Sequence, residues 1–216
     1  MNTCMSDEKG NASLFLLWVL GIVVILFAII INITKVFLVG SEASYTVQQA
    51  ALAGSSVYIK ESKAAIEEFD NHLAASIDFK LNHGGKSLGE LVREQQDAHE
   101  GTGLSSDQAY IKALNDVLPS EIDAHDQLKN TFRSRLNSSS FSTAISNAVQ
   151  SVIRDSEEAN SEDTTIVLSN SEWRLEVESS VTFESITGVN IPLFKDKIPA
   201  RGEGPKFIYL ENVYDE

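Results

Sequence analysis

Residues Leu14–Ile33 read LFLLWVLGIVVILFAIIINI, and this stretch decides the architecture of the protein. No charged residue occurs between Gly10 and Thr34. A bilayer core requires roughly 20 apolar residues at 1.5 Å rise each, and only a helix satisfies its own backbone hydrogen bonds in lipid. The sequence therefore predicts a transmembrane helix over residues 13–38, after a short N-terminal segment, residues 1–12.

Several residues of this helix are expected to meet the bilayer. Lys35 lies near its C-terminal end, where a lysine can extend its ammonium group to the lipid head groups. The residues predicted to anchor the helix are Leu14, Trp18, Gly21, Ile25, Phe27, Ile31 and Lys35. A cleaved secretory signal is the alternative, but its apolar region is typically about 7–15 residues long. The length of the apolar run favours an uncleaved anchor.

The net charge belongs to the rest of the chain. The 216-residue sequence has a formal net charge of −14, whereas the acidic and basic residues of residues 1–40 balance. An acidic body disfavours nucleic acid as a partner, because phosphates bind clustered Lys and Arg. It also disfavours docking on anionic lipid. We therefore expect an acidic soluble domain over residues 41–216 that does not bind nucleic acid.

Beyond the anchor, the hydrophobic periodicity predicts helices. Apolar or small residues recur mostly every three or four positions at Val47, Ala51, Gly54, Tyr58, Ile66, Phe69, Leu73 and Ile77. This spacing predicts a helical stalk over residues 39–80 that continues the anchor. Asn82-His83-Gly84-Gly85 is expected to end the stalk. Further helices are predicted at about 88–99, 107–117, 119–137 and 140–154, with Pro119 in the first turn of the third.

The C-terminal region has a different pattern. Apolar and polar residues alternate from Trp173 to Glu184, which predicts a strand with one buried face. Thr164–Leu168 also favours a strand, and Lys206–Val213 is predicted to be the last strand. A loop that contains Pro199 and Gly202 is predicted between this last strand and the alternating segment. The predicted fold class is α+β, with a transmembrane helix, a helical stalk, a helical part over 81–160 and a small antiparallel β-sheet within 161–216.

No group of residues has the spacing of a catalytic or metal site. Gly84-Gly85-Lys86-Ser87 resembles part of a phosphate-binding loop, but Lys80 occupies the position where that motif requires glycine. The acidic run at 155–163 lacks the spacing of a calcium loop and is expected to be a solvated loop. The sequence contains one cysteine, Cys4, and its four histidines lie far apart. We therefore predict no enzyme activity, no catalytic residues, no cofactor and no metal.

Two segments around the anchor resemble a known family. Lys9-Gly10 comes just before the apolar run, and Val47-Gln48-Gln49-Ala50-Ala51-Leu52-Ala53-Gly54 follows it. This arrangement is similar to the N-terminal region of TadE/TadG-like pilus-assembly proteins over about residues 8–58. The resemblance implies a minor pilin-like component of a bacterial Tad/Flp-type pilus or related secretion apparatus. It also implies a single-pass protein of the cytoplasmic membrane, with the N-terminus inside and the body outside. Its partners would be the lipid bilayer and other pilin-like or Tad-system membrane proteins.

The resemblance points to two sets of functional residues. Gly10 is a candidate processing site, although Phe15 stands where processed prepilins usually carry glutamate. The helix-packing and assembly residues would be Gln48, Gln49, Ala50, Ala51, Ala53 and Gly54. Small residues let two helix backbones approach closely, so this run would contact another subunit. The alternative is that the small face packs on the chain's own body.

Two other functional classes stay open. One is a single-pass membrane-anchored extracytoplasmic sensor or ligand-binding domain. The other is an anchored hydrolase, which a deep pocket lined by paired titrating groups would favour. The oligomeric state also stays open at this point.

Overall fold

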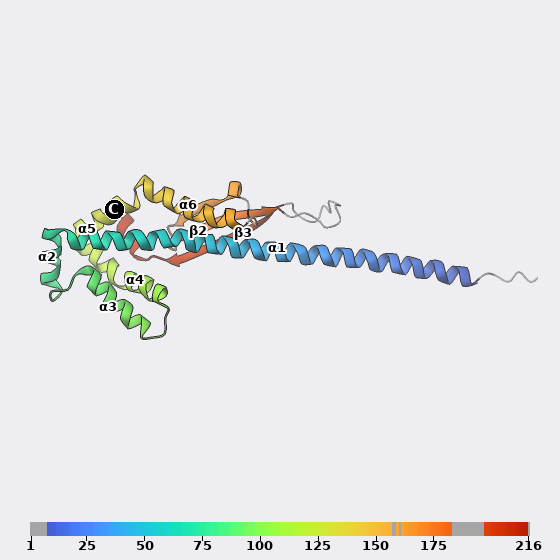
Figure 1. The fold of residues 1–216 in the computed structure, drawn as a ribbon, viewed down its shortest axis with the longest axis horizontal. Coiled ribbons are helices and arrows are strands. Elements are labelled where there is room, and N and C mark those ends of the chain that lie inside the picture. The colour runs from blue at the N-terminus through green and yellow to red at the C-terminus, as the bar shows by residue number, and fades with distance from the viewer. Residues whose placement is uncertain (1–7, 157–158, 160, 183–196, 216) are drawn as a thin grey trace, which may run out of the picture.

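The computed structural model describes residues 8–156, 159, 161–182 and 197–215. Helix α1, Glu8–Asn71, runs through the whole length of the molecule (Figure 1). At 1.5 Å per residue, its 64 residues extend over roughly 96 Å. The N-terminal half of α1 projects alone, and the other described elements gather on its C-terminal half (Figure 1). The prediction that the apolar helix continues into a helical stalk is confirmed.

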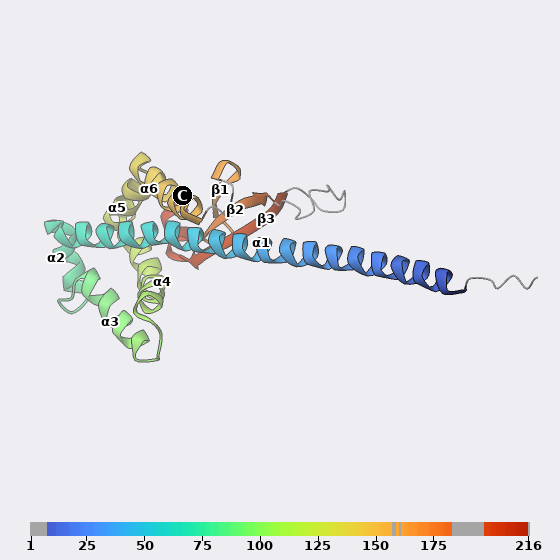
Figure 2. The ribbon, with the colours of Figure 1, turned by 45° about the vertical axis from the view of Figure 1, so that its right-hand side comes forward.

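Helix α1 ends at Asn71, earlier than the hydrophobic periodicity predicts. His72 has extended backbone angles, and its ring nitrogen accepts a 3.4 Å hydrogen bond from the N–H of Ala75, so a new helix starts there. Helix α2, Leu73–Asn82, therefore turns across the end of α1 (Figure 2). The reversal brings the buried ring of Phe79 edge-on to Phe69 at a centroid distance of 5.7 Å. The prediction of one helix up to residue 80 is wrong because this contact requires a bend.

The middle of the chain forms four more helices. They are α3 (Leu88–Glu100), α4 (Ser106–Ala124), α5 (Asp126–Leu136) and α6 (Ser139–Ser156). Ser87 and Ser105 each start a helix with a capping box, in which the serine hydroxyl accepts from the third backbone N–H of the helix. Both α5 and α6 pack on α1. The predicted helical middle is confirmed.

One predicted helix boundary in this region is wrong. Pro119 lies inside α4 and does not start a new helix, and the chain breaks instead at His125. An interior proline costs a helix about 3 kcal/mol because it removes one backbone hydrogen bond. Leu118 and Ile122, on either side of Pro119, are fully buried. Burial of such side chains contributes about 1.5–3 kcal/mol each, which offsets the loss.

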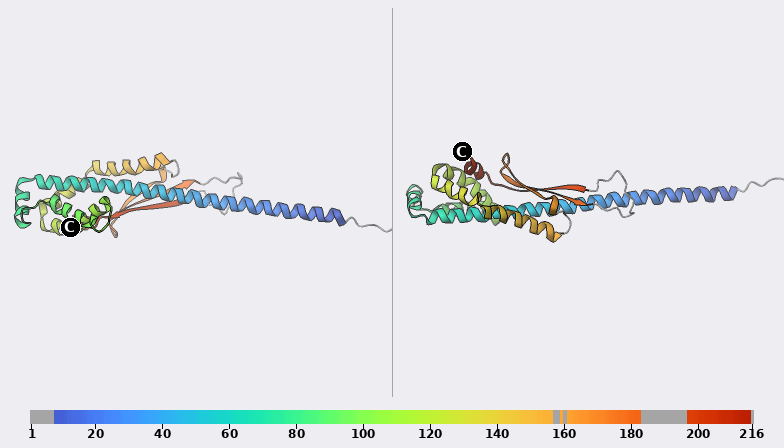
Figure 3. Two further views of the ribbon diagram at one scale, coloured as in Figure 1. Left: turned by 60° about the horizontal axis from the view of Figure 1, so that its bottom comes forward. Right: turned by 90° about the horizontal axis from the view of Figure 1, so that it is seen from above.

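A three-stranded antiparallel sheet follows the helices. Its strands β1 (Thr165–Ser169), β2 (Arg174–Thr182) and β3 (Lys197–Lys206) lie in the order β1-β2-β3. In β2, Leu175, Val177 and Val181 are buried, as the alternating pattern predicts. The sheet and α6 both lie against α1 (Figure 3). The predicted small C-terminal sheet is confirmed, although Phe183 and Glu184 at the end of the predicted strand lie outside the described residues.

The third strand was predicted at the wrong place. The segment predicted as a loop, which contains Pro199 and Gly202, forms β3, and the predicted strand Lys206–Val213 instead enters a short helix, α7 (Tyr209–Tyr214). Proline and glycine are disfavoured in a free strand. Here the backbone of β3 at Gly202 lies against the backbone of α1 at Val47, and only a residue without a Cβ fits there. This tertiary contact outweighs the low strand propensity of glycine.

An aromatic cluster joins α1 to the end of the chain. Tyr58 packs edge-on to Phe141 of α6 at 4.8 Å and stacks on Phe207 at 5.5 Å. The hydroxyl groups of Ser62 and buried Tyr209 share a hydrogen bond of 2.6 Å. Burial raises the pKa of the Tyr209 phenol, which therefore stays protonated. The face of α1 that carries Tyr58 and Ser62 therefore lies at the centre of the body, and α6 and the C-terminal residues pack against it.

Replacing Gly202 by alanine is expected to destabilise the body. The added Cβ would lie 2.3 Å from the backbone oxygen of Val47 and 2.6 Å from the backbone nitrogen of Gln48, so β3 would have to move away from α1. Overpacking of this kind costs about 1–3 kcal/mol. Denaturant unfolding of the full chain in detergent micelles, followed by circular dichroism, measures the change.

Gly40→Ala is the matched control for this substitution. Its Cβ would meet Cγ2 of Ile198 at 3.5 Å, an ordinary contact distance. The structure requires the Gly40 variant to unfold close to the wild-type midpoint. Equal stability of the two variants would contradict the close packing of β3 on α1.

Candidate assembly surface

The large apolar side chains in the N-terminal half of α1 are exposed, with Trp18 at 74% and Phe27 at 61%, although Asn32 in the same stretch is buried. Of the predicted anchor residues with described side chains, Leu14, Trp18, Gly21, Ile25, Phe27 and Ile31 are exposed, and Lys35 is half-buried. Contiguous apolar surface of this extent is not stable in water. By length and composition, α1 is able to cross a membrane.

The body begins close to residue 40 of α1. Gly40 lies against Ile198 of β3, and Ala43 is the first fully buried apolar residue along α1. Gly10, the candidate processing site, lies near the N-terminal end of α1. The free apolar segment and the core segment therefore belong to one uninterrupted helix.

The small residues of α1 pack inside the chain. Ala50 and Ala51 are fully buried, and Gly54 is buried between the sheet and α6. A Cβ at Gly54 would lie 2.4 Å from Cδ2 of Leu175 and 2.9 Å from Cγ2 of Val149. This part of the run therefore serves the packing of the body, which was the alternative left open by the sequence. Ala53, beside it, is half-buried.

Gln48 ties α1 to the backbone of β3. Its Nε2 donates to the carbonyl oxygen of Glu203 at 2.7 Å, and its Oε1 accepts from the N–H of the same residue at 3.1 Å. Gly202 and Gly204 flank this pair and approach Val47 and Ser55 closely. One amide side chain thus satisfies both backbone groups of a strand residue. Sequence periodicity did not reveal this role, because it treats Gln48 as an ordinary polar position.

The opposite face of α1 carries exposed side chains in the part of the chain that the structure describes. Tyr45 is 67% exposed, Leu52 is 50% exposed, and Gln49 and Ser56 are exposed as well. Steps of four, three and four residues place these side chains along one face of the helix. We call Tyr45, Gln49, Leu52 and Ser56 the outer stripe. No acidic residue occurs between Glu42 and Glu61, so the outer stripe is a neutral surface on an acidic body.

The other motifs have structural explanations. Gly84 and Gly85 have positive φ angles of 64° and 88°, which L-residues rarely adopt, and they form the turn before the Ser87 cap of α3. His83 lies against Glu121 at 3.2 Å and stacks on Phe79. In the parts of the chain that the structure describes, no three His, Cys, Asp or Glu side chains are arranged to hold a metal ion.

The acidic run is partly described. Asp163, at its end, accepts hydrogen bonds from Lys197 and Ser180, and these bonds lower the pKa of its carboxyl group. Glu157 and Glu158 lie outside the described residues. Asp163 is therefore an ion-pair partner of β3.

Replacing Gln48 by alanine is expected to destabilise the body, whereas Gln49→Ala is not. The first change leaves the N–H and carbonyl of Glu203 without their partner, which costs about 1–3 kcal/mol. Gln49 is exposed, and a surface substitution there stays within about 0.5 kcal/mol of wild type. The free energies of unfolding of the two variants test this directly. A larger loss for Gln49→Ala than for Gln48→Ala would show that the two amides have been assigned the wrong roles.

The comparisons with known proteins locate a family similarity in this same region. Residues 10–65 match the model of a family described as "Putative Flp pilus-assembly TadE/G-like". No curated protein and no solved structure matches the chain. The matched residues include the apolar helix, the small-residue run and the outer stripe. Over residues 10–65 the chain is similar to the TadE/G-like Flp pilus-assembly family, as the sequence resemblance indicates.

Proposed function

We propose that the protein is a membrane-anchored, minor pilin-like component of a Tad/Flp-type pilus or related secretion apparatus. It acts by assembling with other subunits and not by catalysis. The observation that carries this proposal is the coincidence of the family match, residues 10–65, with the exposed apolar helix and its continuation into the body. The proposed partners are the lipid bilayer and other pilin-like or Tad-system proteins of the same membrane.

The anchor is proposed to hold the chain in the cytoplasmic membrane in a single pass. The hydrophobic part of α1 is longer than the roughly 20 residues that a bilayer core needs, so Lys35 can reach the head groups. The N-terminus would lie inside and the body outside. The −14 charge of the body supports a position that stands off from anionic lipid.

The outer stripe is proposed as the assembly contact. Gln48, Ala50, Ala51 and Gly54 are engaged within the chain, so of the resemblance-derived residues Gln49 is the most available. Tyr45, Leu52 and Ser56 extend that surface from the membrane side along α1. A neighbouring helix that emerges from the same bilayer can lie along this stripe, past Glu42 at its membrane end.

Topology provides the first test. Protease added to spheroplasts is expected to degrade the body and leave a fragment of the membrane helix, while inverted vesicles protect the body. Intact-mass and N-terminal analysis of the extracted protein identifies processing, since cleavage after Gly10 would leave Asn11 as the first residue. A body that is protected in spheroplasts and digested in inverted vesicles would reverse the proposed orientation.

Assembly provides the second test. In cells that lack the gene, wild-type protein should restore pili, whereas Leu52→Arg should leave pili reduced by about tenfold or more, since burying an unpaired charge costs several kcal/mol. Pili are counted by electron microscopy, with membrane levels of each variant checked by immunoblot. Ser142→Arg, at an exposed position of α6, is the matched control and should restore pili. Normal pili and secretion in the cells without the gene would refute the proposed function.

A further inference from the structure

Helix α2 is held in the body by few contacts. Of its ten residues only two, Ser76 and Phe79, are buried. Three large apolar side chains, spaced four residues apart along one side of the helix, are exposed: Leu73, Ile77 and Leu81. An element that buries so little apolar surface opens locally at a low free-energy cost. The position of α2 therefore depends on the ring of Phe79 and on the residue that ends the helix, His83.

Both ring nitrogens of His83 face oxygen atoms. Nδ1 lies 2.9 Å from the carbonyl oxygen of Phe79, and Nε2 lies 3.2 Å from Oε1 of Glu121 near the end of α4. A carbonyl and an ionised carboxylate only accept hydrogen bonds, and a neutral imidazole has a single N–H to donate. Both hydrogen bonds therefore form when the ring carries two protons, and the charged ring then pairs with the carboxylate of Glu121.

This ion pair lies among aromatic rings. The side chains of His83 and Glu121 are only 25% and 15% exposed, so water and salt screen the pair less than a surface pair. The ring of His83 stacks on Phe79 at 4.0 Å, and Phe79 packs edge-on to Phe69 of α1. Among the described residues, His125 is the other titratable group in contact with the pair, with its Nε2 3.6 Å from Oε2 of Glu121. The pair thus joins α2 to α4 beside the contact of α2 with α1.

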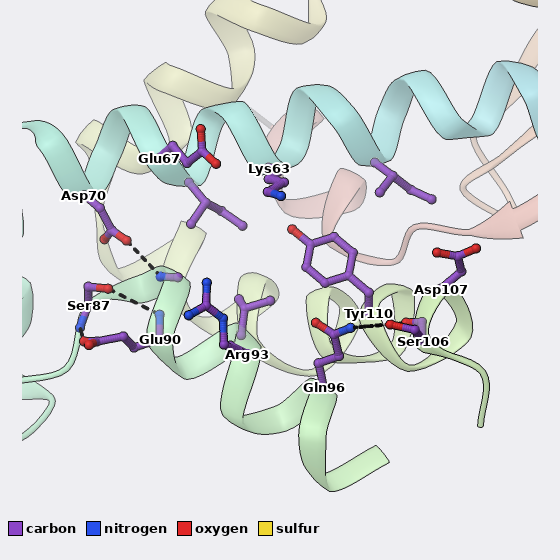
Figure 4. Close-up of a pocket in the computed structure, with 14 residues that line it drawn as sticks. Lys63, Glu67, Asp70, Ser87, Glu90, Arg93, Gln96, Ser106, Asp107 and Tyr110 are labelled. Atoms are coloured by element: carbon purple, nitrogen blue, oxygen red, sulfur yellow. Dashed lines mark hydrogen bonds between the residues drawn. The ribbon is translucent and has the colours of Figure 1, made fainter. Parts of the chain in front are cut away.

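Helix α3, which follows α2, is attached to α1 independently. The carboxylate of Asp70 on α1 accepts hydrogen bonds from the N–H groups of Leu88 and Gly89 at 3.0 and 2.9 Å. Ser87 caps the first turn of α3 beside these bonds (Figure 4). On its other side, α2 is separated from α1 by the break at His72. Helix α2 can therefore move while α1 and α3 stay in place.

We propose that His83 and Glu121 form a proton-controlled latch that holds α2 in the body. With the proton bound, the pair is closed and Phe79 stays packed on Phe69. Without it, a bare ring nitrogen faces an oxygen lone pair, and α2 opens. The closed state binds one proton more than the open state, since an exposed histidine is neutral above about pH 6.5, so raising the pH weakens the latch. The latch belongs to the body and does not depend on pilus assembly.

The histidine at the other end of α2 acts in the opposite direction. Nδ1 of His72 accepts a hydrogen bond from the N–H of Ala75 at 3.4 Å, and this cap requires a nitrogen without a proton. Acid therefore weakens the cap at His72 but closes the latch at His83. A loss of α2 protection on raising the pH has the sign of the latch and not of the cap.

Hydrogen exchange of the full chain in lipid nanodiscs measures the opening of α2. Mass spectrometry follows the amides of residues 73–82 at about pH 6 and about pH 8.5, on either side of the titration of histidine. Each rate is corrected for the intrinsic effect of pH on exchange. Protection of α2 should fall about tenfold between the two conditions, since a hydrogen bond to a charged group contributes at least that factor. The amides of α4 serve as the internal reference and should keep their protection.

Three variants separate a proton-controlled latch from an ordinary contact. In Glu121→Gln the amide N–H can donate to the bare Nε2 of a neutral ring, so α2 should stay protected at both pH values. His83→Phe keeps a ring beside Phe79 but removes both hydrogen bonds, and its α2 should exchange fast at both pH values. His99→Gln is the matched control, because it removes another histidine–carboxylate pair, with Asp116, and should show the wild-type fall. Circular dichroism verifies that each variant is folded.

Each outcome decides for or against the latch. Equal protection of α2 in the wild-type chain at the two pH values would overturn it. A Glu121→Gln or His83→Phe variant whose protection falls as in wild type would also overturn it, since neither pairing partner would then be needed. Loss of the fall in His99→Gln would place the titrating group elsewhere and would count equally against the proposal.

Discussion

The close approach of β3 to α1 is the contact on which the body of this protein depends. Gly202 brings the strand against the backbone of Val47, and the side chain of Gln48 bonds to both backbone groups of Glu203. This contact positions the sheet along α1. It also directs the chain after β3 so that Phe207 reaches Tyr58. Helix α1 and the sheet are therefore joined mainly by the close approach of their backbones. The stacking of Phe207 on Tyr58 adds an aromatic contact after the end of β3.

The same helix has to suit two environments, and its composition changes accordingly. In the exposed apolar segment, side chains such as Trp18 and Phe27 are large. In the body, where another backbone or α6 must come close, Ala50, Ala51 and Gly54 replace them. Large side chains suit lipid contact, whereas only small ones permit backbone contact. Packing within the body buries Ala50, Ala51 and Gly54, whereas the outer stripe stays exposed.

Much of the fold could be predicted from local sequence. The uncharged run before Lys35, the alternation in β2 and the hydrophobic spacing of the helical middle each have a short-range cause. The errors share a different cause. The bend at His72, the unbroken course of α4 through Pro119 and the strand around Gly202 are all set by packing contacts and not by hydrophobic spacing. Local propensity is weaker than such packing, so it failed at these positions.

The sequence by itself determined that an apolar helix leads into an acidic α+β body, and it pointed to the region similar to a pilus-assembly family. The first property follows from composition and from periodicities of two and 3.6 residues, which local sequence contains. The family similarity follows from the resemblance of Lys9-Gly10 and the run from Val47 to Gly54. Only the tertiary structure decided which face of α1 stays free. That depends on where β3 and α6 dock, and docking is settled by the shapes of surfaces that belong to segments far apart in the chain.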